Sequence, residues 1–368
     1  PGAGNQTLGV VFTPTDAINY NSVNRTVTLL VTKATQSIGV FAATGNKTFG
    51  SAAFAVTPPT ATSGLPVVLS VKSGPATLSG NMVTVTGVGT VVLAANQGGD
   101  ANYNAATEVT TTFAVNKATP VISVVPTVGG LTYGQALSNA TLSGGSASVA
   151  GTFAFTNPVT VPGAGSSVQP VTFTPTDAVN YNTASANVSV TVGKATPVVS
   201  WNTPAAISYG TALSGAQLNA SASVNGTFSY SPVAGTVPGA GNQTLGVVFT
   251  PGETANYNSV NRTVTLLVSK GNQTIAAFAP IGNKTYGTGA FAVVAPSASS
   301  NLTVALSVKS GPATISGNMV TMTGTGPVVL AANQGGNTNY NAATEMTTSF
   351  MVASGAVSYT HLRAHETL

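Results

Sequence analysis

The feature that most constrains the fold is internal repetition. The stretch Gly4–Val31 returns almost unchanged as Gly241–Val268. A lysine opens each of four successive segments of similar length, three times as KAT and once as KGN: Lys33, Lys117, Lys194 and Lys270. Fixed-period repetition is typical of chains assembled from small copied units. We therefore interpret the sequence as an array of modules.

Two module types alternate, and a short tail fits neither. Type A covers 117–193 and 194–269, and type B covers 33–116 and 270–354. Residues 1–32 match the second half of type A. The segment SYTHLRAHETL resembles translated adapter or vector read-through, so we expect 355–368 to be a non-domain tail. The predicted order is half A, B, A, A, B.

Each module shows the pattern of β-strands. Apolar residues alternate with small or polar ones, as a strand with one buried face requires; examples are Leu245, Val247, Phe249, Val264, Leu266, Val268, Val188, Val190 and Val192. VPGAG predicts a turn, FTP predicts a strand end, and Gly80-Asn81 predicts a hairpin loop. With about six or seven strands in about 80 residues, each module is expected to be a two-sheet sandwich.

These motifs carry a family likeness. Type A, with KATPVVSWNTPAAISYGTALS, LGVVFTP and ANYN, resembles bacterial immunoglobulin-like repeats of the MBG and group 3 kind. Type B, with GNKTFG, SGPATLSGNMVTVTGVGTVVLAANQ and GGDANYNAA, is similar to group 2 bacterial immunoglobulin-like domains. The resemblance implies an all-β tandem array of small antiparallel immunoglobulin-like β-sandwiches, as found in long secreted or surface-anchored bacterial proteins.

Composition excludes several classes of protein. Although 43% of residues are hydrophobic, the apolar runs are much shorter than the roughly 18 residues that a membrane-spanning helix needs. The net charge of +4 reflects a scarcity of acids, and the cations are scattered singly, whereas a nucleic-acid face needs clustered Lys and Arg. The chain has no cysteine, so disulfides and thiolate chemistry are excluded.

An Asn-Tyr-Asn motif recurs in every module, and an acid precedes it in four copies: Asp16, Asp100, Asp177 and Glu253. One interpretation is a calcium site at the module boundary. Calcium needs six to eight oxygen ligands, whereas each module offers one acid and the last copy has Asn337 in its place. We favour a structural role in which the acid accepts backbone N–H bonds and the tyrosine ring plugs the end of its sandwich.

Type B modules contain charged residues that could form an internal isopeptide bond: Lys47, Lys72 and Glu108, repeated as Lys284, Lys309 and Glu345. Such a bond needs a buried triad of lysine, asparagine and carboxylate. Charged side chains are seldom buried unpaired, so we favour solvated charges on strands or loops.

The aromatic residues could stack on sugars, but they recur at equivalent positions of the repeated modules, as core residues would. Trp201 aligns with Val124 in the preceding type A module, which favours core packing over a binding platform. The same interpretation applies to the alternating aromatics of GTFxF/Y: Phe153, Phe155, Phe228 and Tyr230. Asn-x-Ser/Thr triplets, for example at Asn24, Asn46, Asn187 and Asn261, are attributed to composition.

Both histidines, His361 and His365, lie in the expected tail, and Glu366 follows without the second half of HExxH. The rest of the chain has no histidine and only dispersed acids. Acid–base pairs, nucleophile–base dyads and metal sites all need converging groups. We therefore predict no catalytic residues, no metal site, no cofactor and no enzyme activity.

The predicted function is structural: a stalk or spacer in an extracellular bacterial immunoglobulin-like repeat protein that supports cell-surface adhesion. About 150 Å of reach is expected from four and a half modules at about 3.3 Å per strand residue. Two alternatives remain open, namely carbohydrate-binding accessory modules of a secreted enzyme and homophilic adhesin modules. We expect a monomeric rod that binds no nucleic acid, with any carbohydrate or protein target bound by other domains.

Overall fold

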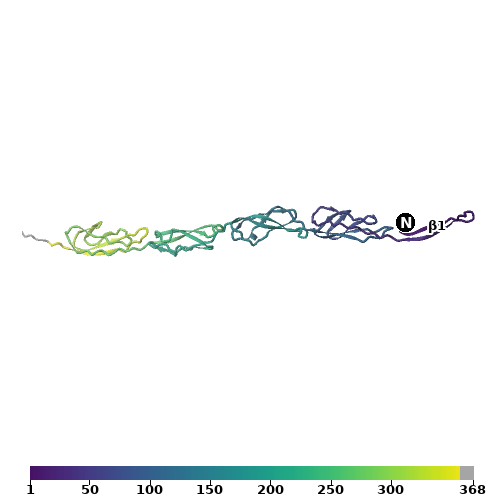
Figure 1. Ribbon diagram of the computed structural model, residues 1–368. Coiled ribbons are helices and arrows are strands. Elements are labelled where there is room, and N and C mark those ends of the chain that lie inside the picture. The colour runs from purple at the N-terminus through teal and green to yellow at the C-terminus, as the bar shows by residue number, and fades with distance from the viewer. Residues whose placement is uncertain (357–368) are drawn as a thin grey trace, which may run out of the picture. The chain divides into compact units, whose positions relative to one another are not determined.

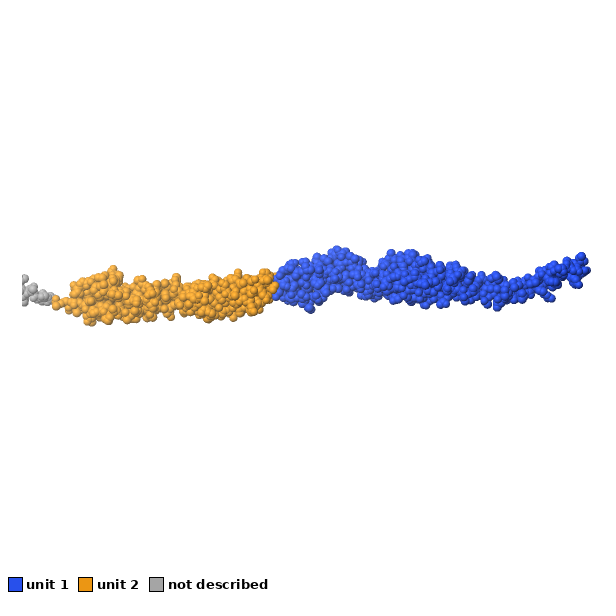
Figure 2. Space-filling view, in the orientation of Figure 1, with its two compact units in different colours: residues 1–193 blue, residues 194–368 orange. Residues whose placement is uncertain are grey.

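The structure is a computed structural model that describes residues 1–356. The chain divides into two compact units, which meet in sequence between Gly193 and Lys194 (Figure 2). Apart from one 3-10 turn, η1 (Leu137–Asn139), every regular element of the described part is a β-strand (Figure 1). The predicted all-β fold class is confirmed.

The first unit begins with a hairpin of β1 (Gly4–Phe12) and β2 (Val23–Val31). The two strands pair antiparallel, with Gly4 opposite Val31 and Phe12 opposite Val23. They form a sheet of two strands.

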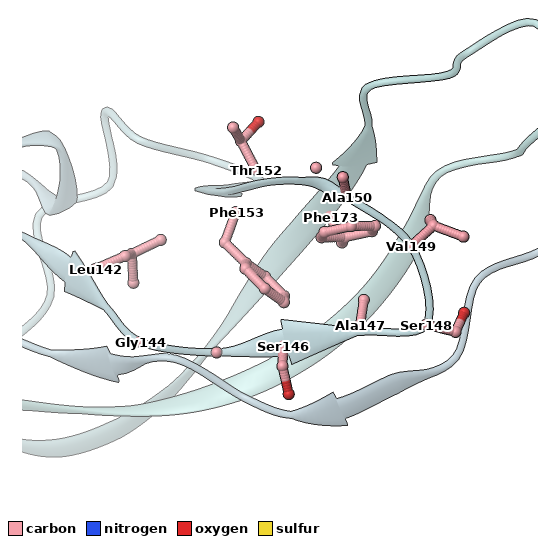
Figure 3. A pocket seen from close by; sticks show the side chains of 12 residues that line it. Leu142, Gly144, Ser146, Ala147, Ser148, Val149, Ala150, Thr152, Phe153 and Phe173 are labelled. Carbon is pink, nitrogen blue, oxygen red and sulfur yellow. The ribbon is translucent and has the colours of Figure 1, made fainter.

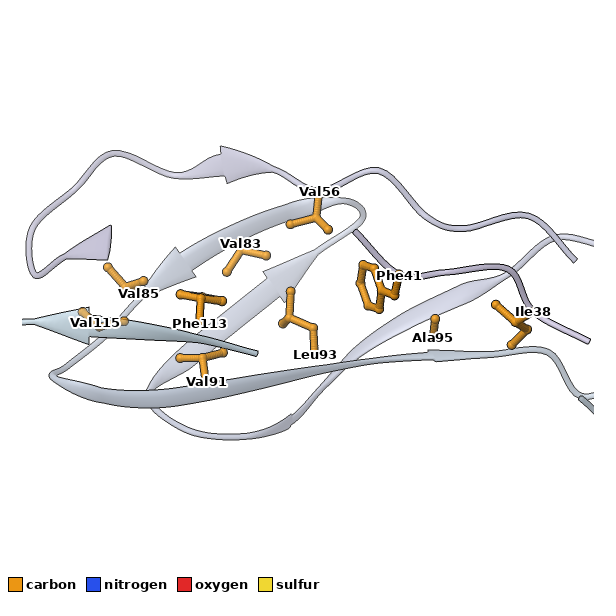
Figure 4. Close-up of a cluster of buried hydrophobic side chains, with 10 residues drawn as sticks. All are labelled: Ile38, Phe41, Val56, Val83, Val85, Val91, Leu93, Ala95, Phe113 and Val115. Carbon is orange, nitrogen blue, oxygen red and sulfur yellow. The ribbon is translucent and has the colours of Figure 1, made fainter. Parts of the chain in front are cut away.

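Residues 33–116 form a sandwich of two sheets. Its strands are β3 (Lys47–Thr48), β4 (Phe54–Ala55), β5 (Val68–Ser73), β6 (Ala76–Ser79), β7 (Met82–Val85), β8 (Gly89–Asn96) and β9 (Val109–Asn116). One sheet has the order β3-β9-β8-β5 and the other β4-β7-β6. Figure 4 shows Val83, Leu93 and Phe113 among the side chains gathered between them. This range therefore encloses an apolar core of its own.

The alternation in sequence explains which face each strand buries. In β8, Val91 and Leu93 are fully buried while Thr90 is exposed, because successive side chains of a strand point to opposite faces. The hairpin predicted at Gly80-Asn81 joins β6 to β7 with Ser79 opposite Met82. That prediction is confirmed.

Residues 117–193 complete the first unit. Their strands are β10 (Ile122–Val124), β11 (Thr127–Val128), β12 (Leu131–Thr132), β13 (Leu142–Ser143), β14 (Ser146–Ala147), β15 (Gly151–Phe155), β16 (Gly165–Pro175) and β17 (Ala184–Gly193). The main sheet has the order β12-β17-β16-β15, and two short ladders, β10-β14 and β11-β13, accompany it. Pro175 ends β16, as the FTP motif predicted.

The second unit repeats both patterns. Residues 194–269 contain β18 (Val199–Ser200), β19 (Ile207–Ser208), β20 (Ser221–Ala222), β21 (Gly226–Ser231), β22 (Gly241–Pro251) and β23 (Val260–Ser269). Residues 270–354 contain β24 (Lys284–Thr285), β25 (Phe291–Ala292), β26 (Ala305–Ser310), β27 (Ala313–Ser316), β28 (Met319–Met322), β29 (Gly326–Asn333) and β30 (Met346–Ala353). The main sheets are β19-β23-β22-β21 and β24-β30-β29-β26.

One feature of the sheets differs from the antiparallel expectation. In each of the four fuller ranges, a two-residue strand pairs in parallel with the last long strand: β3 with β9, β12 with β17, β19 with β23 and β24 with β30. The long pairings are antiparallel, as predicted. The parallel edge strands escaped prediction because two residues cannot display a period.

Trp201 lies in the core, as predicted. Its side chain is 3% exposed, its Nε1 donates to the carbonyl oxygen of Gln217 at 3.0 Å, and its ring lies edge-on to Tyr230. Val124, by contrast, is 56% exposed, so the expectation of core packing at the aligned position is wrong for Val124. The two aligned positions therefore have different environments, and the tryptophan fills space that the valine does not.

Candidate functional site

The Asn-Tyr-Asn turn is built around one acceptor side chain. Asp100 Oδ1 accepts the backbone N–H groups of Asn102 and Tyr103, both at 2.8 Å. In the last module Asn337 Oδ1 accepts from the equivalent N–H groups of Asn339 and Tyr340 at the same distance. The amide oxygen of Asn337 accepts the same two hydrogen bonds as the carboxylate oxygen of Asp100. The turn therefore requires a hydrogen-bond acceptor and not a negative charge.

The same role holds for two further acids. Asp16 and Asp177 each accept the backbone N–H of the first Asn of the motif. A hydrogen bond from the side chain of that Asn, assisted by its backbone N–H, holds the pKa of each carboxyl below its usual value. The predicted structural role is therefore confirmed for Asp16, Asp100 and Asp177, while Glu253 accepts from the side chain of Asn256.

The module-opening lysine ties this turn to the start of its own module. Lys33 Nζ donates to the carbonyl oxygen of Asp100 at 2.6 Å. Equivalent bonds join Lys117 to Ala178, Lys194 to Thr254 and Lys270 to Asn337. Next to the lysine, the backbone of Ala34 donates to Asn102 and accepts from Asn104. We call these lysine hydrogen bonds the lysine latch, which was not predicted from the sequence. The signal that could have revealed it is that the module-opening lysine and the Asn-Tyr-Asn motif recur together in each module.

Within the first unit, the turn also binds the preceding module. Asn180 Oδ1 accepts the backbone N–H of Val88 at 2.9 Å, and the ring of Tyr181 lies 5.5 Å from that of Phe49 at 89°. Edge-to-face contact of this kind is a favoured aromatic geometry. Asn102 Oδ1 likewise accepts the backbone N–H of Ala3, the residue before β1, at 2.8 Å.

The second unit repeats this junction. Asn339 Oδ1 accepts the backbone N–H of Ala240 at 3.0 Å, and the ring of Tyr340 lies 5.2 Å from that of Tyr209 at 84°. That the tyrosine ring plugs the end of its sandwich stays a prediction for Tyr181 and Tyr340, whose half-buried rings also make a contact that was not predicted. Each of these rings packs against an aromatic ring of the module before it.

The charged residues of type B form surface ion pairs. Lys72 Nζ donates to Glu108, and Asn96 Nδ2 donates to the other carboxylate oxygen at 3.1 Å. The set Lys309, Glu345 and Asn333 repeats this arrangement. Lys47 and Lys284 lie apart from these pairs, each 4.4 Å above a phenylalanine ring.

Lysine, asparagine and glutamate are the residue types of an isopeptide site, but their environment opposes the reaction. The Lys72 side chain is 54% exposed, and hydrogen bonds from Lys72 and then Asn96 lower the pKa of Glu108. Attack of a lysine amine on an asparagine amide needs a neutral amine and a protonated acid nearby. The lowered pKa of Glu108 disfavours the protonated acid, and the exposed Lys72 is not in a buried site, so the geometry is that of a solvated ion pair.

A hollow with a volume of about 650 Å³ lies in 117–193. Figure 3 shows the rings of Phe153 and Phe173 beside it, with Ser146, Ser148 and Thr152 around its rim. The two rings pack against each other at 5.0 Å, and Phe173 is 2% exposed. Because a sugar-binding platform presents an exposed ring face, these aromatics have the geometry of core residues. Phe155, Phe228 and Tyr230 are also buried or half-buried.

Residues 1–356 place no three His, Cys, Asp or Glu side chains where they could hold a metal ion. Over the same residues, no helix is long and apolar enough to cross a membrane. His361 and His365 lie outside the described residues, as does most of the expected tail.

No family model and no curated protein matches the chain. Among solved structures, immunoglobulin domains 1–5 of Sidekick-1 align over 91% of this chain and 84% of theirs, with 10% identity and a TM-score of 0.24. A SusE-like surface polysaccharide-binding protein from Bacteroides thetaiotaomicron aligns over 86% and 72%, with 10% identity and a TM-score of 0.18. Domains 4–9 of a surface layer protein align over 95% and 69%, with 13% identity and a TM-score of 0.18.

Proposed function

We propose that the chain is a stalk segment of an extracellular bacterial immunoglobulin-like repeat protein of the MBG kind, which holds other domains at a distance for surface adhesion. The observation that carries the proposal is the repeated junction. Asn-Tyr-Asn is latched to its own module by lysine and bonded to the preceding module by the Asn amide and the Tyr ring. A copied module thus brings along the groups that join it to its neighbour.

The chemistry of the described residues supports a mechanical role over a catalytic one. Their acids accept hydrogen bonds within turns or pair with lysine, so none is left as a free acid–base group in a cleft. Because stability comes from separate cores and ladder hydrogen bonds, length can change by whole modules without altering any core.

Small-angle X-ray scattering on the purified full chain tests the proposal. A single compact globule of this length would have a radius of gyration of roughly 21 Å. A stalk of about 150 Å would give about twice that value. A radius near that of the globule would refute the spacer role.

A junction variant sharpens this test. Combining Asn180→Ala, Tyr181→Ala, Asn339→Ala and Tyr340→Ala removes an amide acceptor and an aromatic ring from one junction in each unit. We expect a broader distribution of distances within the chain, with the modules themselves still folded. Tyr286→Ala is the matched control, because Tyr286 stands at the position of Tyr209 and its side chain is exposed. An equal effect of the control would contradict the role of the junctions.

A further inference from the structure

The turn before β21 contains a dipeptide that its sequence copy lacks. Asn225 is followed by Gly226, the one Asn-Gly pair in the sequence, whereas the first type A module has Ala150-Gly151 at the same place. In both turns the carbonyl oxygen of the first residue accepts a backbone N–H from the facing chain, at 3.0 Å for Asn225 and 2.9 Å for Ala150. The asparagine side chain is therefore not required to form this turn.

Packing requires the glycine of this pair. A Cβ at Gly226 would lie 2.4 Å from the carbonyl oxygen of Thr250 and 2.6 Å from the ring of Phe249. Gly151 is confined in the same way by the ring of Phe173, which a Cβ would approach to 2.5 Å. Because glycine is needed in both copies, the residue before it decides whether the pair is reactive.

Both groups that react in an Asn-Gly pair are accessible in this turn. Asn225 is exposed and lies in a bend, and within residues 1–356 its side-chain amide makes no hydrogen bond. Asn225 belongs to a hydrogen-bonded pair of the β21–β22 ladder, so Gly226 and Pro251 form the next, non-bonded pair. Since β21 is an edge strand, the N–H of Gly226 points away from β22 toward the open side of the sheet.

We propose that Asn225-Gly226 is a site of spontaneous covalent modification, at which the side-chain amide of Asn225 is hydrolysed through a cyclic imide. The backbone nitrogen of Gly226 gives its proton to water and bonds to Cγ of Asn225, while the Cγ–Nδ2 bond breaks and ammonia leaves. The missing Cβ of glycine leaves this approach unhindered. Water then opens the imide at either carbonyl, which gives aspartate or isoaspartate without any oxidant or reductant.

The two products differ in their effect on the module. Aspartate leaves the backbone unchanged and adds a negative charge at an exposed position. Isoaspartate inserts a methylene group into the backbone, which displaces Gly226 from a place beside Phe249 that admits no added atom. We therefore expect the aspartate form to be tolerated and the isoaspartate form to loosen the start of β21. This inference does not depend on the stalk function, because it concerns the chemistry of one turn.

Incubation of the purified full chain at mildly alkaline pH, followed by proteolysis and peptide mass spectrometry, tests the proposal. We expect the mass change of an amide-to-acid conversion at Asn225, with part of the product accepted by an isoaspartyl carboxyl methyltransferase. Asn225→Ala should abolish the product and keep the fold, because alanine is the natural residue of the copy. Since the ends of edge strands open at little cost in free energy, the folded chain should react within about fivefold of the rate in urea.

The copy provides a matched control within the same chain. Ala150→Asn should make the first type A module reactive, at a rate within about threefold of that of Asn225, because the turn and the confined glycine are the same. Asn180, whose side-chain amide donates to Asp177 and which precedes a tyrosine, should stay unchanged. An unreactive Asn225, an unreactive Ala150→Asn variant or equal conversion of Asn180 would overturn the proposal. So would a rate in the folded chain far below that in urea, since the fold would then protect the pair.

Discussion

Individual side chains in this chain are interpretable because copies of the same position occur in different settings. Trp201 and Val124 occupy aligned positions, yet one is enclosed and the other is half-exposed. Asp100 and Asn337 occupy aligned positions and make the same bonds. The first pair shows that alignment does not ensure equal burial, and the second separates the need for an acceptor from the need for a charge.

The tryptophan pair leads to a prediction about stability. Trp201→Ala should destabilise 194–269 by about 3–5 kcal/mol, because it removes a large buried side chain and orphans the carbonyl of Gln217. Val124→Ala should cost about 0.5 kcal/mol or less in 117–193. Differential scanning calorimetry of the full chain measures both as shifts of single transitions. Similar shifts from the two variants would show that Trp201 is not a core residue.

The ion pair of type B predicts a pH dependence. The pKa of Glu108 is lowered in the folded protein, so the pair stabilises the fold above the ordinary carboxyl pKa and loses that effect as pH falls through the lowered value. Glu108→Gln should thus lower the unfolding temperature slightly at pH 7, and by less as the pH falls toward 3. Melting curves at both pH values, with Lys72→Met as the partner control, measure it. A difference that is as large at pH 3 as at pH 7, and unchanged in 1 M salt, would contradict the electrostatic origin.

At the scale of elements, the long strands were predictable and the short ones were not. The alternation around Leu245 or Val190 fixes which face is buried, and the structure buries those residues. The two-residue parallel strands, such as β3, depend on contact with a distant strand end. The lysine latch escaped for the same reason, since Lys33 and Asp100 meet only when the sandwich closes. Local pattern thus determined the strands, and tertiary contact determined the junctions.

A glycine next to the irregular β5–β8 pairing gives an element-scale prediction. Gly74 has φ +99° and a Cβ there would lie 2.2 Å from the carbonyl oxygen of Thr90. Gly80 has φ +58° and open space around it. Gly74→Ala should therefore cost about 3 kcal/mol or more, and Gly80→Ala about 1 kcal/mol. Urea unfolding of 33–116 compares them, and equal costs would show that the β5–β8 region relaxes around the added methyl group.

At the scale of the whole molecule, the separate cores determine how the chain should unfold. The clusters around Leu93, Val190, Leu266 and Leu330 each draw their residues from one predicted module. A chain of this kind should unfold module by module. The free energy of unfolding of each module should include a small contribution from contacts with its neighbours. The slope of the unfolding free energy against denaturant concentration, the m-value, should therefore match that of small domains and not that of one large globule.

Residues 33–116 alone should consequently fold. They enclose a core with fully buried Val83, Val91 and Leu93, and their sheets use strands of this range alone. Extending the fragment to residue 193 adds the Asn180 hydrogen bond and the Phe49–Tyr181 ring pair, together about 1–3 kcal/mol. Urea unfolding should show this gain for 33–193 and show it reduced by Tyr181→Ala. If residues 33–116 alone were unfolded, their two sheets would need contacts with an adjacent module to persist. The modules would then not be independently stable.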